Sequence, residues 1–123
     1  MLRAKGSFSM SSSSIINRVV IGGRAVNDPV SRRVTTRLGD TTKTTFLLRT
    51  VSAPKEPGVR IEVEAWAHVA AFAQRVAKGR RVIIDGRLVV NSWTDANDQT
   101  QYRYAVRADA VHFLDGPDDA VTS

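Results

Sequence analysis

Two stretches of the chain alternate between apolar and polar positions, and each ends in a tryptophan. From Val59 to Trp66 the odd-numbered positions are aliphatic, whereas the even-numbered positions carry Arg, Glu, Glu and Trp. From Arg81 to Trp93, aliphatic residues at 82, 84, 88 and 90 share one parity, and Trp93 has the other parity together with Asp85 and Asn91. A period of two is typical of a β-strand with one buried face. Both tryptophans are therefore predicted on the polar face of a strand.

The remaining patterns predict three further strands and one helix. Strands are predicted over residues 15–26, with a bulge or sharp bend at Gly22-Gly23, over 44–52 and over 100–114. The polar, arginine-rich segment 30–42 reads as a loop with a turn at Gly39-Asp40. Apolar residues at 69, 72, 73 and 76 predict a helix from Ala67 to Lys78 that ends at Gly79. Gly86 is the predicted bulge of strand 81–93.

Five strands with one helix between the third and the fourth follow the element order of an OB-fold. The predicted fold class is therefore all-β with one short helix, in a five-stranded Greek-key barrel. A chain of 123 residues is expected to form one domain. Residues 1–14 are serine-rich and lack acids, so they are predicted to be a disordered arm, with 15–114 as the folded domain and 115–123 as a short acidic tail.

The charge of the chain points to an anionic partner. Its 18 Lys and Arg residues outnumber 12 Asp and Glu residues and leave a net charge of +6. Fourteen of the 18 basic residues are arginine, whose guanidinium stacks on bases and pairs with phosphates through two hydrogen bonds. A basic surface that is merely solvated is the alternative.

Exposed aromatic rings among arginines suit stacking on the bases of single-stranded nucleic acid. Trp66 and Trp93 are the first candidates, followed by Tyr102 and Tyr104 across the final hairpin from Trp93. For each tryptophan the alternative is burial in the barrel or between subunits. For the tyrosines it is a core face, because both share parity with Val106.

The basic candidates for phosphate contacts either interrupt apolar strands or lie in and beside the segment 30–42. They are Arg24, Arg33, Arg37, Lys43, Arg49, Arg87 and Arg103. Arg107 also interrupts an apolar strand and is predicted to point outward. A groove lined in this way follows the backbone of a nucleic acid without reading its sequence.

The sequence offers little for catalysis, cofactors or metals. There is no cysteine, and His68 and His112 lie far apart in the sequence, so a metal site is not expected. Glu62 and Glu64 share a strand face, where solvated carboxylates paired with arginines are favoured over an acid/base pair. No apolar run reaches the length of a membrane span. The absence of cysteine fits a reducing compartment, so we expect a cytoplasmic protein at the nucleoid, with an organelle as the alternative.

At these residues the chain resembles the bacterial single-stranded DNA-binding protein family. The matching motifs are NRVVIGGRAVNDP, EAW before the helix, KGRRVIIDGRL after it, and NSWTD…QYRY in the last hairpin, within residues 15–114. The resemblance implies an OB-fold that assembles through strand edges into a tetramer, or sometimes a dimer. It also implies wrapping of single-stranded DNA without catalysis or cofactor, and a DNA-stacking role for Trp66 and Trp93.

The chain departs from the family pattern at four places. The segment 52–57, SAPKEP, lacks the aromatic that the family often has there. Only twelve residues separate Trp66 from Gly79, and Phe72 fits the buried helix stripe, so no DNA role is carried over to it. The histidine that is linked to assembly is Ala67 here. The end GPDDAVTS lacks the Pro-Phe terminus, so recruitment of other proteins through the tail is not expected.

Together these patterns predict a binding protein and not an enzyme. Its predicted function is sequence-tolerant binding and protection of single-stranded DNA in replication, repair or recombination. Two alternatives remain open: an OB-fold module of the RNA-binding or primosome type, and a protein-interaction domain whose tryptophans lie between subunits.

Overall fold

The structure is a computed structural model, and it describes residues 15–50 and 53–114. The arm predicted at 1–14 and the tail predicted at 115–123 lie outside these residues. Six strands and one helix follow one another along the chain. They are β1 (Val19–Ala25), β2 (Val30–Thr36), β3 (Gly39–Thr50), β4 (Val59–Trp66), α1 (His68–Ala73), β5 (Arg81–Thr94) and β6 (Thr100–Phe113).

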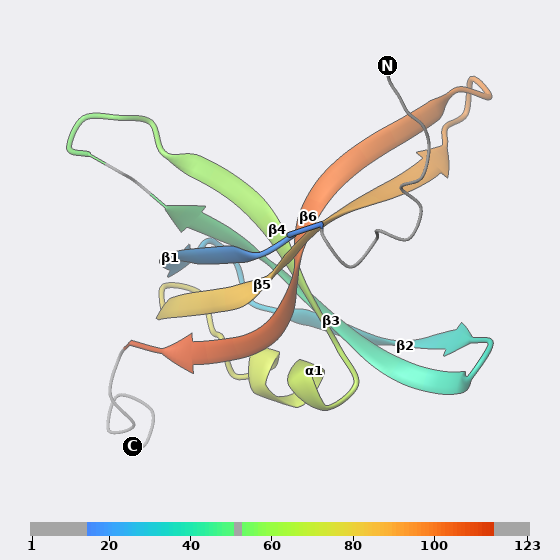
Figure 1. Ribbon diagram of the computed structural model, residues 1–123, viewed down its shortest axis with the longest axis horizontal. Coiled ribbons are helices and arrows are strands. Elements are labelled where there is room, and N and C mark those ends of the chain that lie inside the picture. The colour runs from blue at the N-terminus through green and yellow to red at the C-terminus, as the bar shows by residue number, and fades with distance from the viewer. Residues whose placement is uncertain (1–14, 51–52, 115–123) are drawn as a thin grey trace.

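Five of the six strands close into a barrel. The strands pair in the order β1-β5-β6-β4-β3, and β1 pairs with β3 at Arg24↔Arg49 and Ala25↔Leu48 to close the ring. All of these pairs are antiparallel except β4 with β6. In the described part of the chain, β2 pairs with β3 alone and extends the barrel as a hairpin (Figure 1). The predicted five-stranded OB-fold is confirmed.

The prediction of a loop over residues 30–42 is wrong. This segment forms β2, a turn at 37–38 and the start of β3, paired in register from Val30↔Thr45 to Thr36↔Gly39. The predicted turn lies within two residues of the observed one, and Gly39 has a φ of 115°, which a glycine adopts without strain. Because this hairpin projects beyond the barrel, no residue of β2 is buried, and its sequence shows no apolar alternation.

The core lies inside the ring, and α1 closes one of its ends. Leu48, Val63 and Ile84 are fully buried there. Val69 and Ala73 pack onto them from the helix. No helix of the described residues is long and apolar enough to cross a membrane.

The helix is shorter than predicted, and one of its residues is placed differently. It ends at Ala73, after which Arg75 and Val76 donate to the carbonyls three residues earlier, and this tighter turn is not α-helical. Val76 is buried as expected, but Phe72 is 49% exposed. The buried residues of this segment are Val69, Ala70, Ala73 and Val76, so the assignment of Phe72 to the buried stripe is wrong.

The second half of β5 and the first half of β6 form an arm that extends past the barrel (Figure 1). Leu88 and Val90 continue the parity of the core residues of β5, yet they are 41% and 53% exposed. Alternation in this arm therefore separates two solvent-facing sides and no longer separates core from surface.

Two glycines allow the close approaches that shape the barrel. A Cβ on Gly23 would lie 2.1 Å from the carbonyl oxygen of Arg49, where β1 meets β3. A Cβ on Gly86 would lie 2.0 Å from the carbonyl oxygen of Arg107. The pairing of β5 with β6 shifts register between Asp85 and Gly86. The irregularity predicted at Gly86 is confirmed.

We expect Gly23→Ala to lower the free energy of unfolding by about 1–3 kcal/mol, because its Cβ meets backbone atoms that cannot move aside. Gly22→Ala is the matched control, since its Cβ would meet the Ile83 side chain at 3.4 Å, an ordinary contact. Urea unfolding of both variants measures the difference. Equal losses would show that the closure of β1 on β3 does not require a glycine.

Candidate functional site

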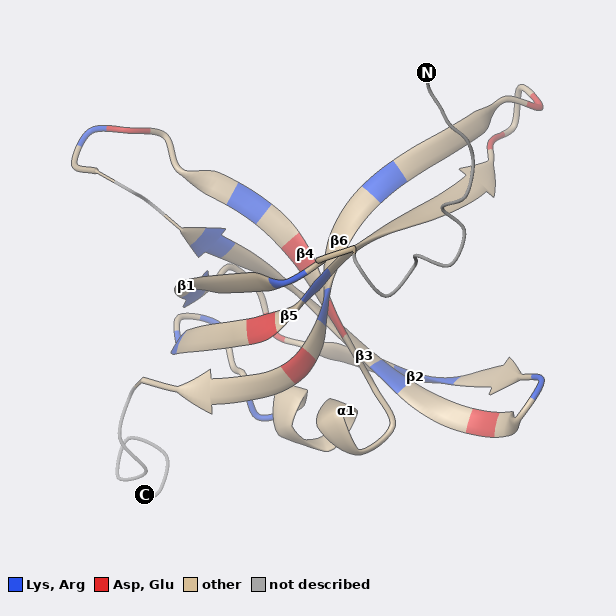
Figure 2. Ribbon diagram, viewed as in Figure 1, with Lys and Arg blue, Asp and Glu red and all other residues tan. Residues whose placement is uncertain are grey.

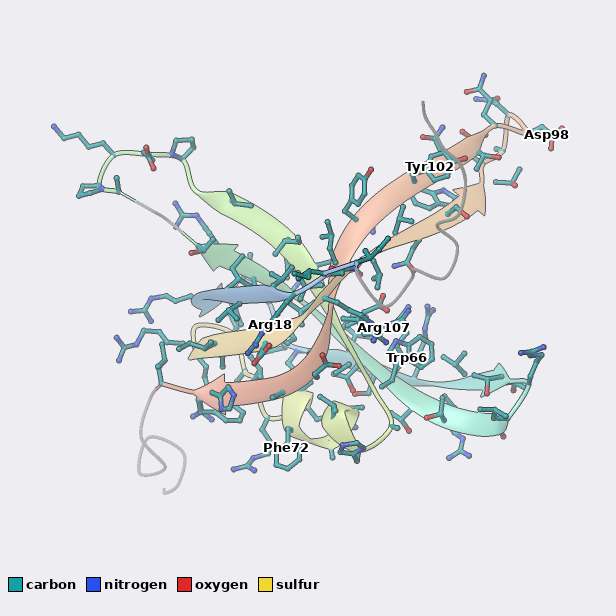
Figure 3. All side chains as sticks on the ribbon, viewed as in Figure 1. Arg18, Trp66, Phe72, Asp98, Tyr102 and Arg107 are labelled. Atoms are coloured by element: carbon teal, nitrogen blue, oxygen red, sulfur yellow. The ribbon has the colours of Figure 1, made fainter. Side chains whose placement is uncertain are left out.

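Trp66 ends β4 between two basic side chains. Basic residues lie on both projecting hairpins and along the barrel (Figure 2). The ammonium of Lys43, which pairs with Trp66 across β3 and β4, lies 5.2 Å from the centre of the indole ring. The guanidinium of Arg107 on β6 lies 5.6 Å from the same ring, and Figure 3 shows the two side chains together. Both distances are typical of cation–π contacts.

A buried carboxylate organises this group. Only 1% of the Glu64 side chain is exposed. Its oxygens accept hydrogen bonds from Trp66 Nε1 at 3.0 Å, Asn91 Nδ2 at 3.0 Å and Arg107 Nε at 2.8 Å. Lys43 Nζ lies 3.7 Å away as a further ion pair. The expectation of a solvated Glu64 is wrong, whereas its predicted pairing with an arginine is confirmed.

The surroundings of Glu64 lower its pKa below the usual 4.5. Burial acts in the opposite direction and is the largest single influence, because it disfavours the charged form. The hydrogen bonds from Trp66, Asn91 and Arg107, with the charge of Lys43, together outweigh it. Glu64 is therefore ionised at neutral pH and holds the indole and two cations in place.

Trp93 lies near the tip of the β5–β6 arm and is 44% exposed. The guanidinium of Arg103 lies 5.3 Å from the centre of its ring and 3.9 Å from Glu62. In the register of the arm, Arg103 pairs with Asn91, which bonds to Glu64. Trp93 and Trp66 thus share one outer side of the protein, which we call the tryptophan face. The prediction that both tryptophans lie on the polar strand face is confirmed.

The two tyrosines lie on the reverse side of the same arm. Tyr104 pairs with Val90 and Tyr102 with Ser92, whereas Trp93 pairs with Gln101 on the other parity. Tyr102 and Tyr104 are 67% and 65% exposed. They share parity with Val106 as expected, but they lie beyond the barrel and not in its core. The structure does not bring them together with the tryptophans, and their role in binding stays a prediction.

The predicted basic residues separate into three groups. Lys43, Arg87 and Arg103 lie on the tryptophan face, where Arg87 pairs with Arg107 across β5 and β6. Arg33 and Arg37 lie on the β2–β3 hairpin, and Arg33 is 3.7 Å from Asp40. Arg24 and Arg49 pair with each other at the end of β3 that is far from Trp66. Along β3, Arg49 lies six residues, or about 20 Å, from Lys43, which pairs with Trp66.

Sequence reasoning missed the central position of Glu64, its contact with Asn91 and the exposed ring of Phe72, and it named Arg107 only as an outward basic residue. Alternation put Glu64 and Trp66 on one face, but the contacts with Asn91 and Arg107 depend on the parallel pairing of β4 with β6, which no local pattern reveals. Phe72 lines a hollow between α1 and β6 together with His68 and Asp109.

Comparison with known proteins gives one family. Residues 16–114 match the model of the single-strand binding protein family. A single-stranded DNA-binding protein of Wolinella succinogenes is 36% identical over 56 residues, which are 45% of this chain and 35% of that protein. One from Caldanaerobacter subterraneus is 29% identical over 82% of this chain and 69% of its own length. The matched region thus spans about a third of the length of the Wolinella succinogenes protein.

Solved structures share the fold. A deletion mutant of the single-stranded DNA-binding protein from Thermus aquaticus superposes with a TM-score of 0.64 and 26% identity, covering 82% of this chain and 42% of that one. The Plasmodium falciparum protein in complex with single-stranded DNA superposes with a TM-score of 0.65 and 20% identity, covering 83% and 97%. At that identity the second likeness concerns the fold alone.

We expect Glu64→Gln to lower the free energy of unfolding at pH 7 by about 1–3 kcal/mol, because Lys43 and Arg107 lose their carboxylate. A carboxyl whose pKa is lowered by folding stabilises the protein above pH 4.5, and this contribution is lost as the pH falls through the folded pKa. The difference between wild type and variant should therefore shrink from pH 7 to pH 3, as measured by denaturant unfolding at each pH.

Glu62→Gln is the matched control. The Glu62 side chain is 28% exposed and its ion pair with Arg103 is 3.9 Å long, so the change should be about 0.5 kcal/mol or less. A Glu64→Gln effect of that size, or one that does not depend on pH, would contradict a central role for the buried carboxylate.

Proposed function

The chain belongs to the single-strand binding protein family, and from this membership we propose that it binds and protects single-stranded DNA without reading its sequence. The observation that carries the proposal is the tryptophan face, on which two indole rings each lie beside a guanidinium. Binding of this kind needs neither catalysis nor a cofactor.

Stacking on Trp93 supplies one part of the proposed affinity. Its exposed ring is open to a base, and such a stack contributes about 1–3 kcal/mol. Arg103 beside the ring is placed to contact the neighbouring phosphate. Because every base has a π-face and every nucleotide a phosphate, these contacts tolerate any sequence.

Trp66 supplies a stacking ring whose orientation is already fixed. The hydrogen bond from its Nε1 to Glu64 holds the indole in place before a ligand arrives, which reduces the entropy lost on binding. Lys43 and Arg107 carry two positive charges against the single negative charge of Glu64. The group therefore keeps a net positive charge that attracts a phosphate. Phe72, also exposed, is a candidate third ring.

We infer that the protein acts as a homo-oligomer, with a tetramer favoured over a dimer. Along the described residues, β1 pairs with β5 on one side but with β3 only at Arg24 and Ala25, so its remaining edge is open to another strand. Val20 is 61% exposed on this strand. The proposed setting is DNA replication, repair or recombination at the nucleoid in the cytoplasm, with an organelle as the alternative.

We expect Trp93→Ala to weaken binding of oligo-dT by about 10- to 100-fold, since the stack on the indole is lost. Quenching of tryptophan fluorescence on titration with oligo-dT measures the affinity, and circular dichroism checks that the fold is retained. Tyr102→Ala is the control, because it removes an aromatic ring from the reverse side of the same arm. We expect it to weaken binding of oligo-dT by about threefold or less.

Three outcomes would contradict this assignment. An equal loss for Tyr102→Ala would place the nucleic acid on both sides of the arm. Fluorescence that is blue-shifted and unaffected by oligo-dT or oligo-U would mean that the tryptophans are covered by another subunit, as in a protein-interaction domain. Equal affinity for oligo-U would favour an RNA-binding module.

We expect the affinity for oligo-dT to fall steeply with salt, because Lys43, Arg103 and Arg107 displace cations from phosphates. Three contacts predict a slope of about −2 in a plot of log affinity against log salt concentration, from about −0.7 for each phosphate. Titrations between low and physiological salt measure it. A flat response would rule out phosphate neutralisation on the tryptophan face.

A further inference from the structure

The buried carboxylate beside Trp66 has its acceptor sites filled from inside the protein. Oε1 of Glu64 accepts from Trp66 Nε1 at 3.0 Å and from Arg107 Nε at 2.8 Å. Oε2 accepts from Asn91 Nδ2 at 3.0 Å and pairs with Lys43 Nζ at 3.7 Å. These four partners match the roughly four lone-pair sites of a carboxylate. Because only 1% of the Glu64 side chain is exposed, a ligand meets its partners and not the carboxylate itself.

The orientation of the indole ring does not require a charge at this position. The neutral amide of a glutamine also carries an oxygen that accepts a hydrogen bond from an indole N–H. A buried ion pair is often no more stabilising than well-packed neutral groups of similar volume. Glu64 is nevertheless ionised, since its partners lower its pKa. What the charge adds is its attraction for Lys43 and Arg107.

Both of these cations can also be reached from solvent. The Arg107 side chain is 34% exposed and that of Lys43 is 17% exposed. Arg107 uses Nε toward Glu64, and among the described residues its two Nη atoms form no hydrogen bond. Lys43 borders a hollow of about 250 Å³ together with Arg32. A phosphate in solvent and the carboxylate inside the protein therefore compete for the same two cations.

This competition reduces what a phosphate gains at the site. Two cations and one carboxylate leave a net charge of +1 where Lys43 and Arg107 alone would have +2. A phosphate that contacts them also lies near the negative charge of Glu64, and like charges at such distances disfavour each other. Stacking of a base on the Trp66 ring is not subject to this repulsion, because the face of the ring carries no carboxylate.

The cation beside Trp93 is not restrained in the same way. Arg103 lies 3.9 Å from Glu62, whose side chain is 28% exposed. Water and salt screen an ion pair of this kind, so it competes weakly with a phosphate. The two rings of the tryptophan face thus differ. Trp93 combines stacking with a nearly free guanidinium, whereas Trp66 lies beside cations that are already occupied.

We propose that Glu64 sets the affinity of the tryptophan face: it is an internal counter-anion that weakens the phosphate contacts of Lys43 and Arg107 and keeps a bound strand exchangeable. This rests on the proposed function. Glu64 acts through other side chains and is therefore a positioning residue. Removal of its charge has opposite effects on the two properties of the protein, because the fold loses a partner for two cations while the strand gains both cations.

The test uses Glu64→Gln, which removes the charge and keeps an oxygen for the indole. Glu62→Gln is the matched control, because it removes one negative charge two residues away on the same strand. Quenching of tryptophan fluorescence measures binding of an oligo-dT of about 12 residues, a length that one OB domain covers. Stopped-flow mixing with excess oligo-dT measures its release. An abasic oligonucleotide of the same length, measured by its displacement of oligo-dT, reports on phosphate contacts without stacking.

We expect Glu64→Gln to bind oligo-dT about fivefold more tightly at 0.1 M salt, the gain for one further neutralised phosphate with a slope of about −0.7. Release should be slower by a similar factor. The abasic oligonucleotide should gain by about the same factor, and the salt slope should become steeper by up to about 0.7. Glu62→Gln should change each affinity by about twofold or less.

A second comparison makes the test independent of the stability of Glu64→Gln. Lys43→Gln and Lys43→Gln/Glu64→Gln differ in the same carboxylate, but here its removal leaves only Arg107 without a partner. The net charge of the group rises from 0 to +1 between these two variants. We therefore expect the double variant to bind oligo-dT about fivefold more tightly than Lys43→Gln. Circular dichroism checks the fold of each variant.

Three results would overturn the inference. The first is that oligo-dT binds no more tightly when Glu64 is replaced, in either background, which would leave Glu64 as a support of the fold alone. The second is an equal gain for Glu62→Gln, which would assign the effect to the overall charge. The third is a gain that the abasic oligonucleotide does not share, which would assign it to stacking. Failure of wild type to bind oligo-dT would instead contradict the proposed function itself.

Discussion

The buried carboxylate of Glu64 is the interaction on which the outer face of this barrel depends. It joins four strands at one point, since its partners come from β3, β4, β5 and β6. A buried charge is tolerated only when it keeps all of its hydrogen-bond and ion-pair partners. Loss of one of these side chains therefore weakens the contacts of the others. The Trp66 ring, the cations beside it and the base of the β5–β6 arm are thus fixed by one group. Stability and the geometry of the site are coupled at Glu64.

The barrel and its two projecting hairpins follow different constraints. Inside the ring, alternation is enforced by the core, and a change of parity would expose aliphatic side chains. Beyond the ring no core requires either side to be apolar, so both sides of the β5–β6 arm carry exposed aromatics. Tryptophan with arginine occupies one side and tyrosine the other. The arm is therefore where this small fold exposes large flat rings while the core below stays closed.

This division explains what the sequence could predict. The fold class and the outward placement of Trp66 and Trp93 followed from alternation, because those strands border the core. The β2 strand was missed because neither of its sides is buried, and Leu88 appeared to be core because alternation continues past the end of the ring. The burial of Glu64 could not be predicted from the sequence, because it depends on strand pairing that brings it to Arg107, 43 positions away. Phe72 was assigned to the helix stripe, although the short helix turns it outward.

Positive charge is arranged differently at the two ends of the outer face, and the difference has a physical consequence. Near Trp66 the cations already pair with Glu64, so an incoming phosphate must share them, and the net gain per contact is reduced. Where Arg24, Arg49 and Arg60 pair across β1, β3 and β4, an anion would relieve the repulsion between neighbours, so the gain per contact would be increased. The carboxylate thus fixes the position of the indole ring, whereas the neighbouring arginines favour the approach of an anion.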